Sequence, residues 1–128
     1  METVDKKIKI LVAEDNLINQ KLLFRLLQKM NAEFKIVNNG EEVMNAVEDE
    51  NYDLIFMDIH MPIMDGVQAT KLIKEKAASG AKDSIIIAMT ANVMKDDIDN
   101  FMEIGMTDVI TKPFSMSEFS SMVSKYSG

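Results

Sequence analysis

Short apolar runs alternate along this chain with segments whose apolar residues recur at helical spacing. The runs predict strands near residues 8–14, 34–38, 53–58, 84–89 and 107–110. Apolar residues at 22, 23, 26, 27 and 30 share one face of a helix, and similar spacing predicts helices near 41–49, 69–77, 94–102 and 116–126. Ser115 with Glu118 forms a capping box for the last of these. This strict alternation predicts the α/β class, with a doubly wound sheet of five parallel strands and helices on both faces.

Polar side chains stand where four of the predicted strands end. Glu14 and Asp15 follow the first strand, Asp58 ends the third, Thr90 follows the fourth, and Lys112 follows the fifth. The carboxyl ends of parallel strands share one edge of a sheet, and ligands of such folds bind beyond that edge. We therefore expect these five side chains to converge in one crevice.

Three carboxylates brought together raise one another's pKa unless a cation compensates, and Mg²⁺ prefers oxygen ligands of this kind. Asp58 could be a helix cap, a metal ligand or a nucleophile, since carboxylates accept phosphoryl groups. Lys112 could be a solvated surface cation, but Pro113 beside it favours an ammonium held in place for an incoming anion. Thr90 is either an ordinary strand residue or a hydroxyl donor to a phosphoryl oxygen.

Length and charge narrow the class of protein. The 128 residues fit one domain spanning 1–128, and 14 basic against 21 acidic residues give a net charge of −7 without a basic run. We therefore expect no direct contact with nucleic acid. No apolar run approaches the ~20 residues that cross a bilayer, and there is no Cys, so we expect a cytoplasmic protein without membrane contact. The single His, His60, lacks a partner for acid/base work. Most of the 12 Met are interpreted as core packing, and Met61 and Met64, which flank Pro62 in the loop after Asp58, are expected to cover the edge of the crevice.

Four motifs, taken in order along nearly the whole chain, resemble the receiver domains of two-component response regulators. That resemblance implies a flavodoxin-like (βα)5 fold with strand order 2-1-3-4-5. It also implies a signalling domain that accepts a phosphoryl group, rather than an enzyme. The motifs are Glu14-Asp15, Asp58 followed by Met61-Pro62-x-Met64-Asp65-Gly66, Thr90-Ala91 and Lys112-Pro113-Phe114.

The resemblance also implies the roles of the site residues. Asp58 would accept the phosphoryl group from a phosphohistidine of a histidine kinase or a histidine phosphotransfer protein. Mg²⁺ or Mn²⁺ would be held by Asp15, Asp58 and the backbone carbonyl of His60, with Glu14 acting through water. Thr90 and Lys112 would bind the phosphoryl oxygens. The Lys112-Pro113 peptide would be cis, and the domain would be a monomer or a weak dimer.

Details of the motifs separate this chain from related alternatives. Glu14-Asp15-Asn16 with Asn19, and the segment from Asp58 to Pro62, are most similar to receivers of hybrid sensor histidine kinases. Val109 stands where the family often has Tyr or Phe, which argues against an aromatic switch.

Three other functions share parts of the pattern. A pseudo-receiver that only binds partners is the main alternative, although it usually lacks one of the acids or the Lys. A haloacid dehalogenase phosphatase expects a second Asp where this chain has His60. An FMN module expects a phosphate-cradling loop where this chain has Glu14-Asp15-Asn16.

Overall fold

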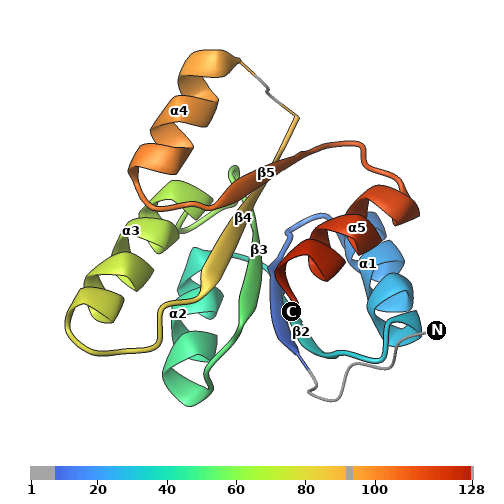
Figure 1. Cartoon of the computed structure of the whole chain (residues 1–128), viewed down its shortest axis with the longest axis horizontal. Helices are drawn as coiled ribbons and strands as arrows, with labels where there is room; N and C mark the ends of the chain where they lie inside the picture. Colours follow the sequence, from blue (N-terminus) through green and yellow to red (C-terminus); the bar gives the residue numbers. More distant parts are fainter. Residues whose placement is uncertain (1–7, 92–93, 128) are drawn as a thin grey trace.

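The computed structural model describes residues 8–91 and 94–127, which form a single sheet covered by helices (Figure 1). All strand pairs are parallel, in the order β2-β1-β3-β4-β5. The predicted doubly wound fold is therefore confirmed, and so is the strand order that the resemblance implies. The elements are β1 (Lys9–Ala13), α1 (Leu17–Lys29), β2 (Glu33–Val37), α2 (Gly40–Asp49), β3 (Leu54–Asp58), α3 (Gly66–Ala78), β4 (Ile85–Thr90), α4 (Lys95–Glu103), β5 (Asp108–Thr111) and α5 (Met116–Tyr126).

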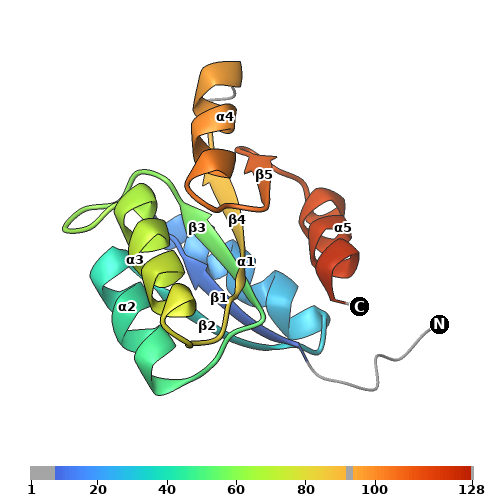
Figure 2. The ribbon, with the colours of Figure 1, turned by 60° about the vertical axis from the view of Figure 1, so that its left-hand side comes forward.

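The sheet separates two hydrophobic cores. Along β1, Ile10 and Val12 pack with α1 and α5, whereas Leu11 and Ala13 pack with α2, α3 and α4. Figure 2 shows α2 and α3 on one side of the sheet and α1 and α5 on the other. Because the central strands are buried on both faces, they consist of continuous apolar runs. A polar residue ends β3 and β4 and directly follows β1.

Helix α1 begins at Leu17, five residues before the first residue of the predicted apolar stripe. Asn16 caps it, with its side-chain oxygen accepting a hydrogen bond from the backbone N–H of Asn19 at 3.0 Å. Leu17 and Ile18 in its first turn are exposed and do not join the buried stripe. The predicted capping box of Ser115 and Glu118 is confirmed at the start of α5.

The register of the sheet aligns the polar strand ends. Asp58 pairs with Met89 and Thr90 with Thr111, so each predicted site residue lies at or just beyond the same edge. Gly66 allows the loop after β3 to turn back tightly, because a Cβ there would lie 2.3 Å from the Asp58 carbonyl oxygen. Its backbone N–H donates to the Ile59 carbonyl at 3.0 Å.

None of the helices in the described part of the chain combines the length and apolar character needed to span a membrane.

Candidate functional site

Three carboxylates meet at the carboxyl ends of β1 and β3. Glu14, Asp15 and Asp58 each place one oxygen within 4.8 Å of the others, a set that could hold a metal ion. Glu14 is 1 % exposed and Asp58 6 %, while Asp15 is open to solvent. The predicted convergence of these residues is confirmed. An all-oxygen donor set with one solvent-facing member fits Mg²⁺, which keeps part of its water shell.

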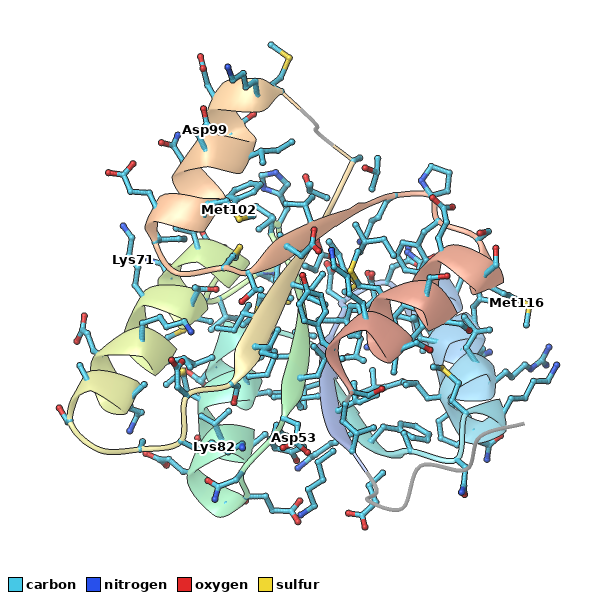
Figure 3. All side chains as sticks on the ribbon, viewed as in Figure 1. Asp53, Lys71, Lys82, Asp99, Met102 and Met116 are labelled. Atoms are coloured by element: carbon cyan, nitrogen blue, oxygen red, sulfur yellow. The ribbon has the colours of Figure 1, made fainter. Side chains whose placement is uncertain are left out.

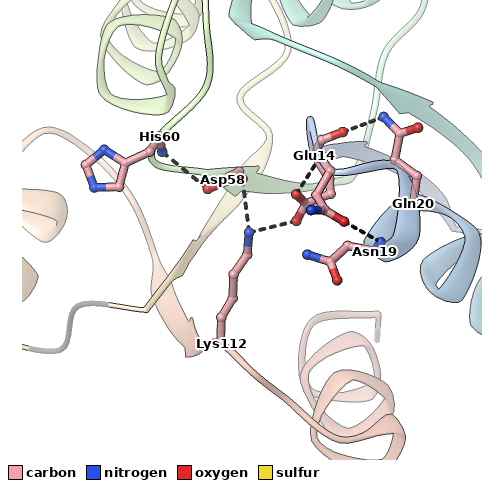
Figure 4. A network of polar contacts seen from close by, with 7 residues as sticks. Glu14, Asn19, Gln20, Asp58, His60 and Lys112 are labelled. Carbon is pink, nitrogen blue, oxygen red and sulfur yellow. Dashed lines mark hydrogen bonds and ion pairs between the residues drawn. The ribbon is translucent and has the colours of Figure 1, made fainter.

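Lys112 reaches into this cluster from the end of β5 (Figure 4). Its Nζ lies 3.0 Å from Asp58 Oδ2 and 2.8 Å from Glu14 Oε1. Burial alone would lower the pKa of Lys112, but hydrogen bonds to Glu14 and Asp58 outweigh it and raise that pKa. The ammonium is therefore held charged between the two buried carboxylates.

Burial is the largest cause of the raised pKa of Asp58. The Lys112 ammonium opposes this effect, and the charge of Glu14 adds a smaller upward contribution. The sequence predicts that repulsion among the acids raises this pKa; the repulsion from Glu14 is present but contributes less than burial. Desolvation dominates because Asp58 closes a fully buried strand, so its carboxylate lies close to the apolar core.

Thr90 and His60 flank the cluster. Thr90 is buried at the end of β4, and its backbone carbonyl accepts a hydrogen bond from the Lys112 N–H at 2.9 Å. The backbone N–H of His60 donates to Asp58 Oδ1 at 3.2 Å. The exposed imidazole of His60 points away from Asp58 in Figure 4, so its side chain takes no part in the cluster.

Two residues that support Glu14 were not predicted. Gln20 Nε2 donates to the Glu14 carbonyl at 2.5 Å and to Asn38 Oδ1 at 2.6 Å, and the Asn16 N–H donates to Glu14 Oε2 at 3.1 Å. Asn16 could have been found, because an Asn before an apolar helix is a typical cap. Gln20 carries no sequence signal, because its role depends on the packing of α1 beside β1 and β2.

In the loops around the site, the expected cis peptide is confirmed and the expected position of two methionines is wrong. The Lys112-Pro113 peptide is cis, as the resemblance implies. Met61 and Met64 were expected to cover the edge of the site, but they pack into the core shared with α2 and α3. The Met64 carbonyl accepts the Gly40 N–H at 2.8 Å, which draws this loop toward α2 instead. Val109 is half-buried against the same core.

Comparison with known proteins gives matches over most of the chain. The response regulator receiver domain family matches residues 10–124. Hybrid signal transduction histidine kinase K of Dictyostelium discoideum is 37 % identical over 121 residues, which cover 91 % of this chain and 10 % of that protein. The chain thus spans about a tenth of the length of that curated relative.

Two solved structures resemble this one closely. The receiver domain of sensor histidine kinase PA1611 from Pseudomonas aeruginosa, with a magnesium ion coordinated in its active site cleft, is 31 % identical with a TM-score of 0.82. That match covers 94 % of this chain and 98 % of that one. A chain in the co-crystal structure of the Saccharomyces cerevisiae histidine phosphotransfer protein Ypd1 with the receiver domain of Ssk1 is 30 % identical. Its TM-score is 0.90, over 97 % and 91 % of the two chains.

The family match extends from β1 into α5 and so includes every strand end that builds the acidic cluster. The strand order, the carboxylates and the bridging lysine agree with it. This chain therefore belongs to the response regulator receiver domain family, a family of phosphoacceptor signalling modules in two-component systems.

Proposed function

We propose that this domain accepts a phosphoryl group from a phosphohistidine onto Asp58, with Mg²⁺ or Mn²⁺ bound, and signals by a change of conformation. The observation that carries the proposal is the Lys112 ammonium, held 3.0 Å from Asp58 Oδ2 among three carboxylates. Phosphoryl transfer demands mainly positioning and charge neutralisation, and both are built into this cluster.

The chemistry assigns Asp58 the role of nucleophile. One of its carboxylate oxygens forms the new bond to phosphorus as the phosphorus–nitrogen bond to the donor imidazole breaks, and the electron pair of that bond stays on the imidazole nitrogen. The His60 N–H restrains Oδ1, while Lys112 moves from a carboxylate partner to the arriving phosphoryl oxygens. The Thr90 hydroxyl, at the end of the neighbouring strand, donates to another of these oxygens.

Asp15, Asp58 and the backbone carbonyl of His60 would hold the cation, with Glu14 contributing through water. Bound there, it supplies positive charge that offsets the repulsion between the carboxylates and the incoming phosphoryl group. The exposure of Asp15 suits this role, because a ligand at the rim leaves the cation open to water and to the phosphoryl oxygens.

The proposed donor is a histidine phosphotransfer protein or the histidine kinase itself. A cavity of about 240 Å³ beside Lys112 is lined by Asn19, Leu22, Leu23, Ala91, Lys112, Pro113 and Phe114. Ile18 and Leu22 are exposed on the adjoining face of α1. Exposed apolar side chains bordering a reactive crevice are typical anchors of a protein interface. We infer that the donor docks on α1 and on the loop carrying Phe114.

Intact mass measurement tests the proposal. After incubation with acetyl phosphate and Mg²⁺, the wild-type chain should gain one phosphoryl mass, and Asp58→Asn should gain none. Asp53→Asn is the matched control, because Asp53 immediately precedes the same strand but lies at its opposite end. An adduct retained by Asp58→Asn would rule out Asp58 as the acceptor, and an equal loss in Asp53→Asn would show that the loss is not specific to Asp58.

A further inference from the structure

A second groove lies on the other flank of α1, between this helix and the edge strand β2. It measures about 320 Å³ and is lined by Leu17, Gln20, Lys21, Phe24, Arg25, Ile36 and Asn38. It shares no lining residue with the cavity at Phe114. Helix α1 and β2 are neighbours in Figure 1, and β2 closes one side of the sheet, so this face is open to solvent.

The floor of this groove is apolar. Leu17 is 64 % exposed and Phe24 47 %, although both are large hydrophobic residues. The Phe24 ring stands edge-on to Phe34 of β2, with centroids 5.3 Å apart. A preformed concave strip that leaves this much apolar surface in water is a typical place for a partner to dock.

The rim of the groove is basic, in contrast with the rest of the protein. Helix α1 carries Lys21, Arg25 and Lys29 and no acidic residue, whereas the whole chain has a net charge of −7. Within residues 8–91 and 94–127, no carboxylate forms an ion pair with any of these three side chains. Lys21 and Arg25 are therefore available to a negatively charged partner.

We propose that this groove docks an acidic amphipathic helix of a partner protein. Such a helix would place apolar side chains on Leu17, Phe24 and Ile36, and carboxylates beside Lys21 and Arg25. A lipid bilayer fits less well, because a flat surface does not fill a concave groove lined by Leu17, Phe24 and Ile36.

Gln20 connects this groove to the acidic cluster. Its side chain lines the groove and donates to the backbone carbonyl of Glu14, whose carboxylate lies 2.8 Å from Lys112 (Figure 4). A partner helix that displaces or orders Gln20 therefore changes the hydrogen bond that Gln20 donates to Glu14, a residue of the acidic cluster. A partner bound in the groove can in this way change the position of Glu14 without contacting the acidic cluster.

The test is a ¹H–¹⁵N NMR titration of the full 128-residue chain with a synthetic helical peptide of Glu and Leu at i, i+3 and i+4 spacing. Saturable shifts should appear at Leu17, Lys21, Phe24 and Ile36, and also at the Glu14 amide. Lys21→Glu should weaken binding by about fivefold, because attraction becomes repulsion at an exposed site that the fold does not need. Lys71→Glu, an equal charge change on α3, should leave affinity within about twofold (Figure 3).

Three results would overturn the docking proposal, and a fourth would overturn its link to the acidic cluster. The peptide could fail to bind with saturation, or its shifts could fall on Ile18, Leu22 and Phe114 instead. Binding to phosphatidylserine vesicles in the absence of peptide binding would identify a membrane surface. A peptide seated in the groove that leaves the Glu14 resonance unmoved would remove the link through Gln20.

Discussion

At the amino ends of the strands, carboxylates each meet a cation of their own, whereas at the carboxyl ends the buried Glu14 and Asp58 share Lys112 and lie close to a third carboxylate, Asp15. Asp53 pairs with Lys82 at 3.3 Å and also accepts the Lys9 N–H at 2.9 Å, and Asp83 pairs with Lys74 at 2.6 Å. Figure 3 shows Asp53 and Lys82 near each other at the end of the sheet away from the site.

Two aspartates at opposite ends of the sheet have pKa values shifted in opposite directions. Asp108, at the amino end of β5, would have its pKa raised by burial, but hydrogen bonds from Tyr126, Val109 and Lys125 outweigh this and lower it. Asp58, at the opposite end of the sheet, has a raised pKa because burial outweighs its contact with Lys112. The amino-end charges are neutralised within the fold, while the carboxyl end keeps a surplus of negative charge for something that arrives from outside.

Removing the shared cation should have the largest effect. In EDTA, Lys112→Ala leaves Glu14 and Asp58 buried without their cation, and we expect the free energy of unfolding to fall by about 3 kcal/mol. The amino-end counterpart, Lys82→Ala, breaks a more exposed pair and should cost about 0.5 kcal/mol. Urea denaturation of both variants checks this. Equal losses of unfolding free energy in the two variants would mean that the cations at the two ends of the sheet stabilise the fold equally.

Magnesium should stabilise the wild-type chain through the carboxyl end alone. At a free Mg²⁺ concentration of 100 times Kd, the free energy of unfolding should rise by about 2.7 kcal/mol, because only the folded state brings the carboxylates together. Asp15→Asn should lose most of this gain, and Asp108→Asn should keep it. Calorimetric titration and melting curves with Mg²⁺ measure both. Undiminished stabilisation of Asp15→Asn would show that the cation binds elsewhere.

The apolar border of the site should matter only to a protein donor. Phe114→Ala is expected to slow transfer from a phosphorylated histidine phosphotransfer protein by about tenfold, as loss of an interface anchor typically does. The reaction with acetyl phosphate should remain nearly unchanged. Rapid-mix labelling with the two donors makes the comparison. If both reactions slowed equally, the defect would lie in the packing of Phe114 on Phe119 and not in docking.

The two aspartates should also give opposite pH dependences in EDTA. Because the folded-state pKa of Asp58 lies above its ordinary value of 3.8, its contribution to stability is greatest at low pH and falls as the pH rises through the folded pKa. The lowered pKa of Asp108 gives a contribution present above 3.8 that is lost as the pH falls through the folded pKa. Denaturation across pH should show Asp58→Asn flattening the first slope and Asp108→Asn the second. If Asp58→Asn flattened the slope assigned to Asp108, and Asp108→Asn the slope assigned to Asp58, the stated pKa directions would be wrong.

Much of the site at the carboxyl end of the sheet could be predicted from the sequence. A polar residue that follows an apolar run indicates both that a strand is present and where it ends. Asp58 and Thr90 were located in this way, and parallel pairing then required their proximity. Gln20 and Asn38 could not be predicted, since their contacts depend on how α1 packs beside β2. The balance of forces on Asp58 was also out of reach, because the pattern of charges reveals repulsion but not the extent of burial.

The amino end was less predictable for the same reason. Lys82 and Asp53 are separated by 29 residues, and no periodic pattern links a loop lysine to a residue before a strand. Their pairing follows from the course of the loop between α3 and β4. Sequence patterns thus revealed the end of the sheet that carries chemistry, and left the stabilising end to the structure.

The most direct test is the melting of two matched variants in EDTA at neutral pH. Asp58→Asn removes one charge from the crowded carboxyl end, and Asp53→Asn removes one from the paired amino end of the same strand. The account predicts that Asp58→Asn is more stable than wild type by about 1 kcal/mol and that Asp53→Asn is less stable. If Asp58→Asn melted below wild type, Asp58 would be a satisfied structural residue, and the surplus of charge at the carboxyl end would not exist.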